Sequence, residues 1–128
     1  MAFTQQCFIR KNTPELRGKL EEIGRKLLFS ARNGYGSNLF AFKGQFGTVQ
    51  AYTVPCFGHF SIDCGTNEEM FLALAALRDD TDRNQWFVDD VYGMWEQSES
   101  ELPSRYMQLN GHKATAEEIV EHFKEEPK

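Results

Sequence analysis

Residues 39–63, LFAFKGQFGTVQAYTVPCFGHFSID, decide the fold class of this chain. Apolar, aromatic and β-branched runs at 39–42, 48–54 and 57–63 predict consecutive strands, and GQFG at 44–47 predicts a hairpin turn between the first two. Consecutive strands with short connections pair antiparallel. The stretch therefore predicts an antiparallel or mixed sheet, and it argues against the strict strand–helix alternation of a doubly wound fold.

Residues 13–28 contain the clearest helix signal. Thr13 is a good N-cap, Pro14 suits the first helical position, and apolar residues at 16, 20, 23 and 27 form one stripe. The opposite face pairs acidic with basic residues at i,i+4 spacing, for example Glu21 with Arg25. We therefore predict a helix over 13–28 that buries its apolar stripe.

Capping boxes predict the beginning of two more helices. TNEE at 66–69 precedes an apolar run that ends near residue 78, and TAEE at 115–118 begins the last helix. Further strands are predicted at 7–9, 85–88 and 105–109, whereas 91–103 fits no single element. The expected architecture is α+β: a single domain over 1–128, with an antiparallel or mixed sheet of about five to six strands and three helices mainly on one face. Residues 1–5 and 125–128 are expected to fray.

Composition places the chain among ordinary globular proteins. Its 128 residues are 41% hydrophobic and 26% charged, which fits one domain with a real core. No run of about 18 apolar residues predicts a membrane span, and MAFTQQCFIRK at the start lacks the apolar core of a secretory signal. The odd cysteine count, three, fits free thiols in a reducing compartment. We therefore expect a cytoplasmic location and no membrane partner.

Charge is distributed unevenly along the chain. The net charge of −5 argues against nucleic-acid binding, although the helix at 13–28 keeps that function open as an alternative. Residues 1–45 hold eight basic and three acidic residues, whereas 46–128 hold six basic and sixteen acidic residues. This asymmetry could mark a partner surface. The ion pairs predicted along 13–28 explain the basic residues without a ligand, and we prefer that explanation.

Three phrases carry a resemblance to other proteins: CFIRKNTPELRGKLEEIG at 7–24, DCGTNEEMFLALAALRDDTDRNQWF at 63–87 and HKATAEEIVEHF at 112–123. Together they span a little under half of the chain, and GYGSNLFAF at 34–42 adds a weaker similarity. They resemble a group of small proteins, without an assigned activity, carried by phages and mobile elements of gut bacteria. The resemblance implies a cytoplasmic accessory role and transfers no catalytic residue.

The segment from Cys56 to Cys64 raises two enzyme hypotheses. Cys56, His59, Asp63 and Cys64 suggest a zinc site, but an extended strand would separate the two sulfurs by roughly 26 Å. Cys64 also precedes a predicted helix, where a thiol can acquire a lowered pKa, yet the sequence places no histidine beside it. A thiol- or metal-dependent enzyme is therefore an alternative. We predict no catalytic residue, metal or cofactor, and expect the thiols to be buried.

The stretch from 79 to 101 combines acidic and aromatic residues. Its acids lack the spacing of a calcium-binding loop. Acidic residues beside exposed aromatic rings could bind a basic partner peptide or a second copy of the chain, although aromatic residues also build cores. The sequence thus favours a small protein-interaction or self-associating accessory module. The residues predicted for its interface are Asp79, Asp80, Asp82, Trp86, Tyr92 and Trp95.

Overall fold

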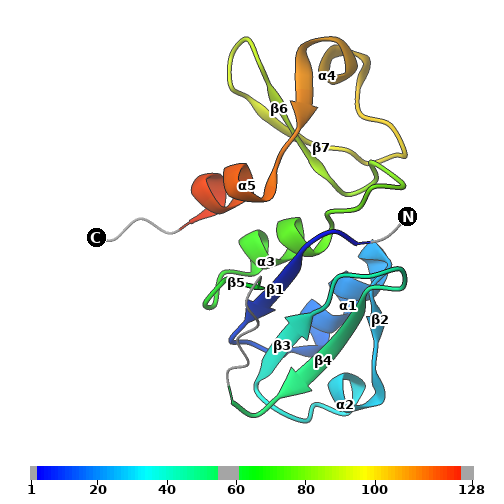
Figure 1. The fold of residues 1–128 in the computed structure, drawn as a ribbon, viewed down its shortest axis with the longest axis vertical. Coiled ribbons are helices and arrows are strands. Elements are labelled where there is room, and N and C mark those ends of the chain that lie inside the picture. The colour runs from blue at the N-terminus through cyan, green and yellow to red at the C-terminus, as the bar shows by residue number, and fades with distance from the viewer. Residues whose placement is uncertain (1–2, 55–60, 125–128) are drawn as a thin grey trace.

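The computed structural model describes residues 3–54 and 61–124, which form two lobes with a helix between them (Figure 1). The large lobe, residues 3–54 and 61–78, contains a mixed five-stranded sheet of order β2-β4-β3-β1-β5. Its strands are β1 (Gln6–Ile9), β2 (Lys26–Leu27), β3 (Asn38–Ala41), β4 (Thr48–Tyr52) and β5 (Ser61–Asp63). Its helices are α1 (Pro14–Ile23), α2 (Phe29–Arg32) and α3 (Glu68–Ala75).

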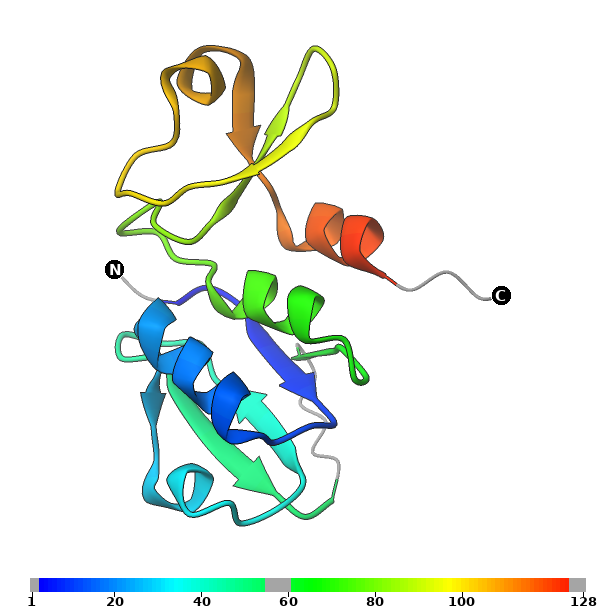
Figure 2. The same ribbon diagram turned by 180° about the vertical axis from the view of Figure 1, so that it is seen from behind.

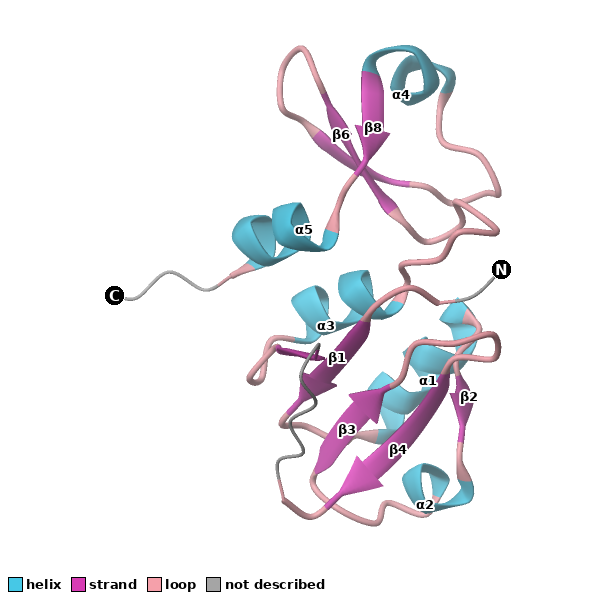
Figure 3. Cartoon of the chain, viewed as in Figure 1, coloured by secondary structure: helices cyan, strands magenta, loops and turns pink. Residues whose placement is uncertain are grey.

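The small lobe, residues 79–113, contains an antiparallel three-stranded sheet of order β7-β6-β8 (Figure 3). Its elements are β6 (Trp86–Asp89), β7 (Trp95–Gln97), α4 (Arg105–Asn110) and β8 (Gly111–Lys113). The last helix, α5 (Ala116–Phe123), lies between the lobes. The α+β prediction and the mixed five-stranded sheet are confirmed, but the described strands form two sheets, and the described helices number five rather than three.

One face of the large sheet forms the core beneath α1 and α3 (Figure 2). The register places Cys7 opposite Ala41 and Ile9 opposite Leu39, so these apolar side chains share that face. All four are fully buried. Because successive side chains of a strand alternate between faces, the aromatic residues between them point to the other side of the sheet. The sheet is therefore apolar on both faces.

Helix α1 begins as predicted and ends earlier than predicted. Thr13 accepts a hydrogen bond from the Leu16 N–H at 3.1 Å, and Pro14 occupies the first helical position. The helix ends at Ile23, because Gly24 adopts a left-handed conformation with φ of 108°. Residues 26–27 then form β2, parallel to β4. The predicted extension to residue 28 is wrong.

Arg25 explains why the chain leaves the helix at this point. Its side chain is 1% exposed. The guanidinium donates hydrogen bonds to three carbonyl oxygens: those of Ala75 at 2.9 Å, Gln5 at 3.1 Å and Phe42. The Phe3 ring lies 3.9 Å from the guanidinium carbon. Arg25 therefore joins three segments of the large lobe and forms no helical ion pair with an acidic residue, contrary to the prediction.

Two further elements differ from the sequence prediction. Helix α3 is capped by Asn67, whose side chain accepts a hydrogen bond from the Met70 N–H at 3.1 Å, rather than by Thr66. The predicted strand at 105–109 is instead α4, because the Ser104 hydroxyl caps its first turn. The capping box at 115–118 is confirmed. The predicted strand at 57–63 is observed only at Ser61–Asp63, since 57–60 lie outside the described residues.

Helix α5 connects the two lobes through one hydrophobic cluster. Ile119 is fully buried in the cluster that also contains the core of the large lobe. Trp86 and Trp95 of the small sheet pack against the same cluster. Within the described residues, no helix combines the length and the apolar character needed to cross a membrane.

Candidate functional site

The acidic residues predicted for an interface lie where the small lobe begins. Asp80 accepts two hydrogen bonds from the Arg78 guanidinium, at 2.7 and 2.6 Å, and these bonds lower the pKa of Asp80. Asp82 forms an ion pair with Lys113 at 2.8 Å. Asp79 is exposed. Asp80 and Asp82 are therefore engaged in ion pairs within the chain, which explains their position without a ligand.

The two tryptophans lie together on the face of the small sheet that meets α5. The ring of Trp86 lies 5.4 Å from that of Phe123, and the ring of Trp95 lies 6.0 Å from it. Trp95 also stacks on His122, with centroids 4.0 Å apart and an interplanar angle of 13°. Both tryptophans are half-buried, whereas Tyr92 is 75% exposed between β6 and β7. The predicted aromatic residues thus contribute both to packing and to surface.

A hollow of about 510 Å³ lies between α5 and the β6–β7 hairpin, and we call it the acidic groove. Trp95 and Val88 supply its apolar part, and three glutamates of α5 supply its charge. The lining residues are Val88, Gly93, Trp95, Glu117, Glu118, Glu121 and His122. The sequence prediction missed the α5 residues, because nothing local connects residue 95 with residue 122. Residues 79–124 hold eleven acidic and four basic residues, so the surroundings are acidic too.

His112 supports one side of this groove. Its Nδ1 lies 2.6 Å from an Asp90 carboxylate oxygen, and its Nε2 lies 2.9 Å from Glu118 Oε2. The hydrogen bond to Glu118, followed by that to Asp90, raises the pKa of His112. Partial burial favours a raised pKa for Glu118, but hydrogen bonds from Thr115 and His112 outweigh it and lower that pKa. The imidazole therefore joins β8, the β6–β7 turn and the first turn of α5.

The small lobe also exposes apolar side chains. Six of the ten large hydrophobic residues that are exposed in the described part of the chain belong to this lobe. They are Val91, Tyr92, Met94, Leu102, Tyr106 and Leu109. Tyr106 nevertheless donates a hydrogen bond from its hydroxyl to Asp89 at 2.8 Å, which fixes α4 on β6. The lobe is therefore acidic and partly apolar, a combination found at protein-binding surfaces.

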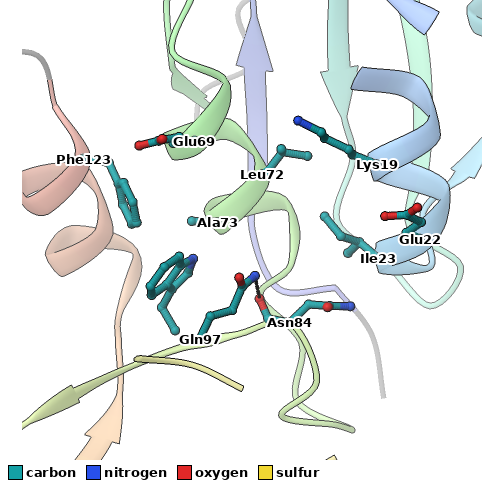
Figure 4. A pocket seen from close by; sticks show the side chains of 10 residues that line it. Lys19, Glu22, Ile23, Glu69, Leu72, Ala73, Asn84, Gln97 and Phe123 are labelled. Carbon is teal, nitrogen blue, oxygen red and sulfur yellow. Dashed lines mark hydrogen bonds between the residues drawn. The ribbon is translucent and has the colours of Figure 1, made fainter. Parts of the chain in front are cut away.

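A second hollow, the interlobe pocket, lies where α1, α3, α5 and the small sheet meet (Figure 4). Its volume is about 460 Å³. Trp86 lines this pocket, whereas Trp95 lines the acidic groove. A spectroscopic signal from each tryptophan is therefore sensitive to ligand binding in a different hollow.

The described thiols do not have the properties of catalytic groups. Cys7 and Cys64 are free and buried. Burial raises the pKa of Cys7 to about 12 and also raises that of Cys64, so neither is a thiolate near neutral pH. Cys56 and His59 lie outside the described residues. Within the described ranges, no cluster of His, Cys, Asp and Glu side chains could hold a metal ion.

The helix proposed for nucleic-acid binding carries little basic surface. Over Pro14–Ile23 it has the basic residues Arg17 and Lys19 and three glutamates. Arg25, which the prediction counted on its exposed face, is buried in the core. The favourable electrostatic interaction with phosphates that such a function requires is therefore weak along this helix.

Comparison with known proteins adds no functional assignment, since no family model, curated protein or solved structure gave a significant match to this chain.

Proposed function

We propose that this chain is a small interaction module that binds a basic segment of a partner protein in the acidic groove. The observation that carries this proposal is that Trp95 and three glutamates of α5 line the same hollow. Lysine and arginine side chains lay their aliphatic stems on apolar surface, which Val88 and Trp95 provide here, and the nearby carboxylates attract their charge. The free, buried Cys7 and Cys64 support a reducing, cytoplasmic environment for this module.

The spacing of the acidic rim suits an extended segment. Glu117 and Glu121 are separated by four residues on one helix, so their Cβ atoms lie about 6 Å apart. Alternate side chains of an extended chain lie about 6.6 Å apart and point to the same side. Two basic residues separated by one other residue can therefore face both glutamates together. Two adjacent basic residues point to opposite sides of an extended segment, so only one of them can face the rim.

The charges of the large lobe favour another protein over a second copy of this chain. Residues 3–54 and 61–78 contain nine basic residues, and at least six of them make polar contacts within the chain. These contacts join Arg10 to Asp63, Lys11 to Glu68, Arg17 to Asn12, Arg25 to three carbonyl oxygens, Arg32 to Glu21 and Arg78 to Asp80. Most of the cations that this lobe of a second copy could offer to the groove are therefore already engaged.

Fluorescence anisotropy with short labelled peptides tests this function. We expect the alternating peptide Lys-Ser-Lys-Ser-Lys-Ser to bind with a Kd of about 100 µM at low salt, and more weakly as salt screens the charges. A control peptide of the same composition, Lys-Lys-Ser-Ser-Ser-Lys, contains no two lysines separated by one other residue and should therefore bind more weakly. The glutamate version of the alternating peptide should not bind.

Charge reversal provides the matched control. The double variant Glu117→Lys with Glu121→Lys should lose binding of the alternating peptide. The double variant Glu99→Lys with Glu101→Lys makes the same change of net charge in the small lobe, at residues that do not line the groove, and should keep most of the binding. Equal loss in both variants would mean that net charge rather than the groove attracts the peptide. No binding of the alternating peptide, or a dimer in native mass spectra that disappears in the first variant, would overturn the proposal.

A further inference from the structure

We infer that the interlobe pocket binds a small organic amine with an apolar body. The pocket lies at the junction of the two lobes, and its volume of about 460 Å³ is in the range of small-molecule sites. Figure 4 shows side chains from α1, α3, α5 and the small lobe directed around one hollow. The lining residues are Lys19, Glu22, Ile23, Glu69, Leu72, Ala73, Asn84, Trp86, Gln97 and Phe123.

The apolar wall of the pocket comes from both lobes. Trp86 of β6 and Phe123 of α5 meet edge to face, with centroids 5.4 Å apart and planes at 65°. Leu72 of α3 and Ile23 of α1 complete this wall on the side of the large lobe. All four side chains are half-buried. An aromatic or aliphatic body would cover surface that these side chains otherwise leave to water.

The charges of the pocket favour a cation. Glu22 and Glu69 line it together with a single cation, Lys19, so the lining has a net negative charge. Within the described part of the chain, none of these three side chains has a hydrogen-bond or ion-pair partner. The neighbouring Glu68, by contrast, is paired with Lys11 at 2.6 Å. Glu22 and Glu69 are exposed, so a ligand ammonium can pair with either carboxylate without breaking a contact between described residues, and the aromatic rings of Trp86 and Phe123 attract cations further.

Asn84 gives the pocket a preformed polar edge. It has a φ of 67°, and among the described residues it is the one non-glycine with a positive φ. Its backbone N–H donates to the Ser98 carbonyl at 2.8 Å, and its carbonyl accepts a hydrogen bond from Gln97 Nε2 at 3.1 Å (Figure 4). These two hydrogen bonds stabilise the left-handed conformation. They use only the backbone of Asn84, so its side-chain amide can bind a ligand. Asparagine adopts this conformation more readily than most residues, so the edge of the pocket keeps its shape without a ligand.

This site is independent of the acidic groove. The groove uses Trp95 and the outer glutamates of α5, whereas the pocket uses Trp86 and Phe123. None of the residues that line one hollow lines the other. Failure of peptide binding in the groove would therefore leave the inference about the pocket unchanged.

NMR titration of the full chain with phenylalkylamines tests the inference. The series runs from benzylamine to 4-phenylbutylamine, and each amine is matched by the carboxylate of the same body. We expect the best amine to bind with a Kd of about 1 mM and its carboxylate to bind at least tenfold more weakly. The indole N–H signal of Trp86 should move the most during the titration, whereas that of Trp95, whose ring lies 6.0 Å from the ring of Phe123, should move less.

A neighbouring pair of substitutions supplies the control. Glu69→Gln keeps the shape of the side chain and removes its charge, and should weaken amine binding about tenfold. Glu68→Gln makes the same change one residue earlier in the same helix turn, outside the lining, and should change the Kd less than twofold. Glu69→Lys should make the matched carboxylate the better ligand.

Three results would overturn the inference. The first is binding of every amine more weakly than about 10 mM. The second is equal binding of amines and carboxylates, which would leave only an apolar hollow. The third is movement of the Trp95 signal in place of the Trp86 signal, which would place the amine in the acidic groove. Unchanged amine binding in the variant with Glu117→Lys and Glu121→Lys is the further result that supports two separate sites.

Discussion

Replacement of Arg25 by methionine should lower the free energy of unfolding far more than replacement of an exposed basic residue. The guanidinium is buried and donates to the carbonyls of Gln5, Phe42 and Ala75, which belong to three different segments of the large lobe. Methionine fills much of the volume but donates no hydrogen bond. The substitution therefore leaves three carbonyl oxygens without this donor in the interior.

The magnitude follows from opposing contributions. A buried polar group that loses its partner costs about 1–3 kcal/mol, and loss of the contact with Phe3 removes roughly another 1 kcal/mol. Methionine also removes the desolvation cost of a buried cation, the same cost that lowers the pKa of Arg25 to about 10. We expect a net loss of about 3 kcal/mol in the free energy of unfolding. For a chain of 128 residues this corresponds to a decrease in Tm of about 10–15 °C.

Urea unfolding and thermal unfolding, both followed by circular dichroism, measure this effect. Arg83→Met is the control, because Arg83 is exposed and should change the free energy of unfolding by less than about 0.5 kcal/mol. Arg25→Lys keeps a charge but cannot reach three carbonyls, so it should fall between the other two variants. A loss below about 1 kcal/mol for Arg25→Met would refute the structural role assigned to this side chain.

Three other properties of the chain can be tested with single preparations. Gly36→Ala should lower the free energy of unfolding by about 3 kcal/mol in urea titrations, because the left-handed glycine would direct a new Cβ into the backbone of β4. The contacts of His112 should contribute fully to the free energy of unfolding below its ordinary pKa of 6.5, and this contribution should be lost as pH rises through the raised pKa of the folded state. The free energy of unfolding of the His112→Gln variant should not show this decrease. In a Cys56→Ser variant, Cys7 and Cys64 should react with a thiol reagent only after unfolding, and rapid reaction of the native protein would contradict their burial.

Local signals in the sequence predicted the elements whose ends are determined by neighbouring residues. Thr13 caps α1 and TAEE at 115–118 begins α5, because each cap is a hydrogen bond between residues three apart. The GQFG turn at 44–47 does connect two paired strands. The same logic applies at 105–109: Ser104 is a good N-cap, and its hydrogen bond outweighs the β propensity of the apolar residues that follow.

Tertiary contacts explain what the sequence could not predict. Arg25 lies at a helical i,i+4 position from Glu21, but its burial depends on carbonyl groups of residues 5, 42 and 75. The division into two sheets depends on how β6 pairs with β8 across more than twenty residues. The acidic and aromatic stretch predicted from the sequence forms part of the small lobe, and its role as an interface stays a prediction. Helix α5 forms the other side of the groove, and it lies more than twenty residues further along the sequence than Trp95. A local sequence pattern does not predict that these two segments pack together.

The central claim is that the acidic groove binds a basic segment, and mapping of amide shifts tests it most directly. Addition of the alternating lysine–serine peptide to isotope-labelled protein should move the indole N–H of Trp95, the ring signals of His122 and the amides of Glu117–Glu121. The signals of α1 and of the large sheet should remain in place. Shifts concentrated on the large lobe, or spread evenly over all acidic residues, would contradict the claim and assign the peptide binding to net charge alone.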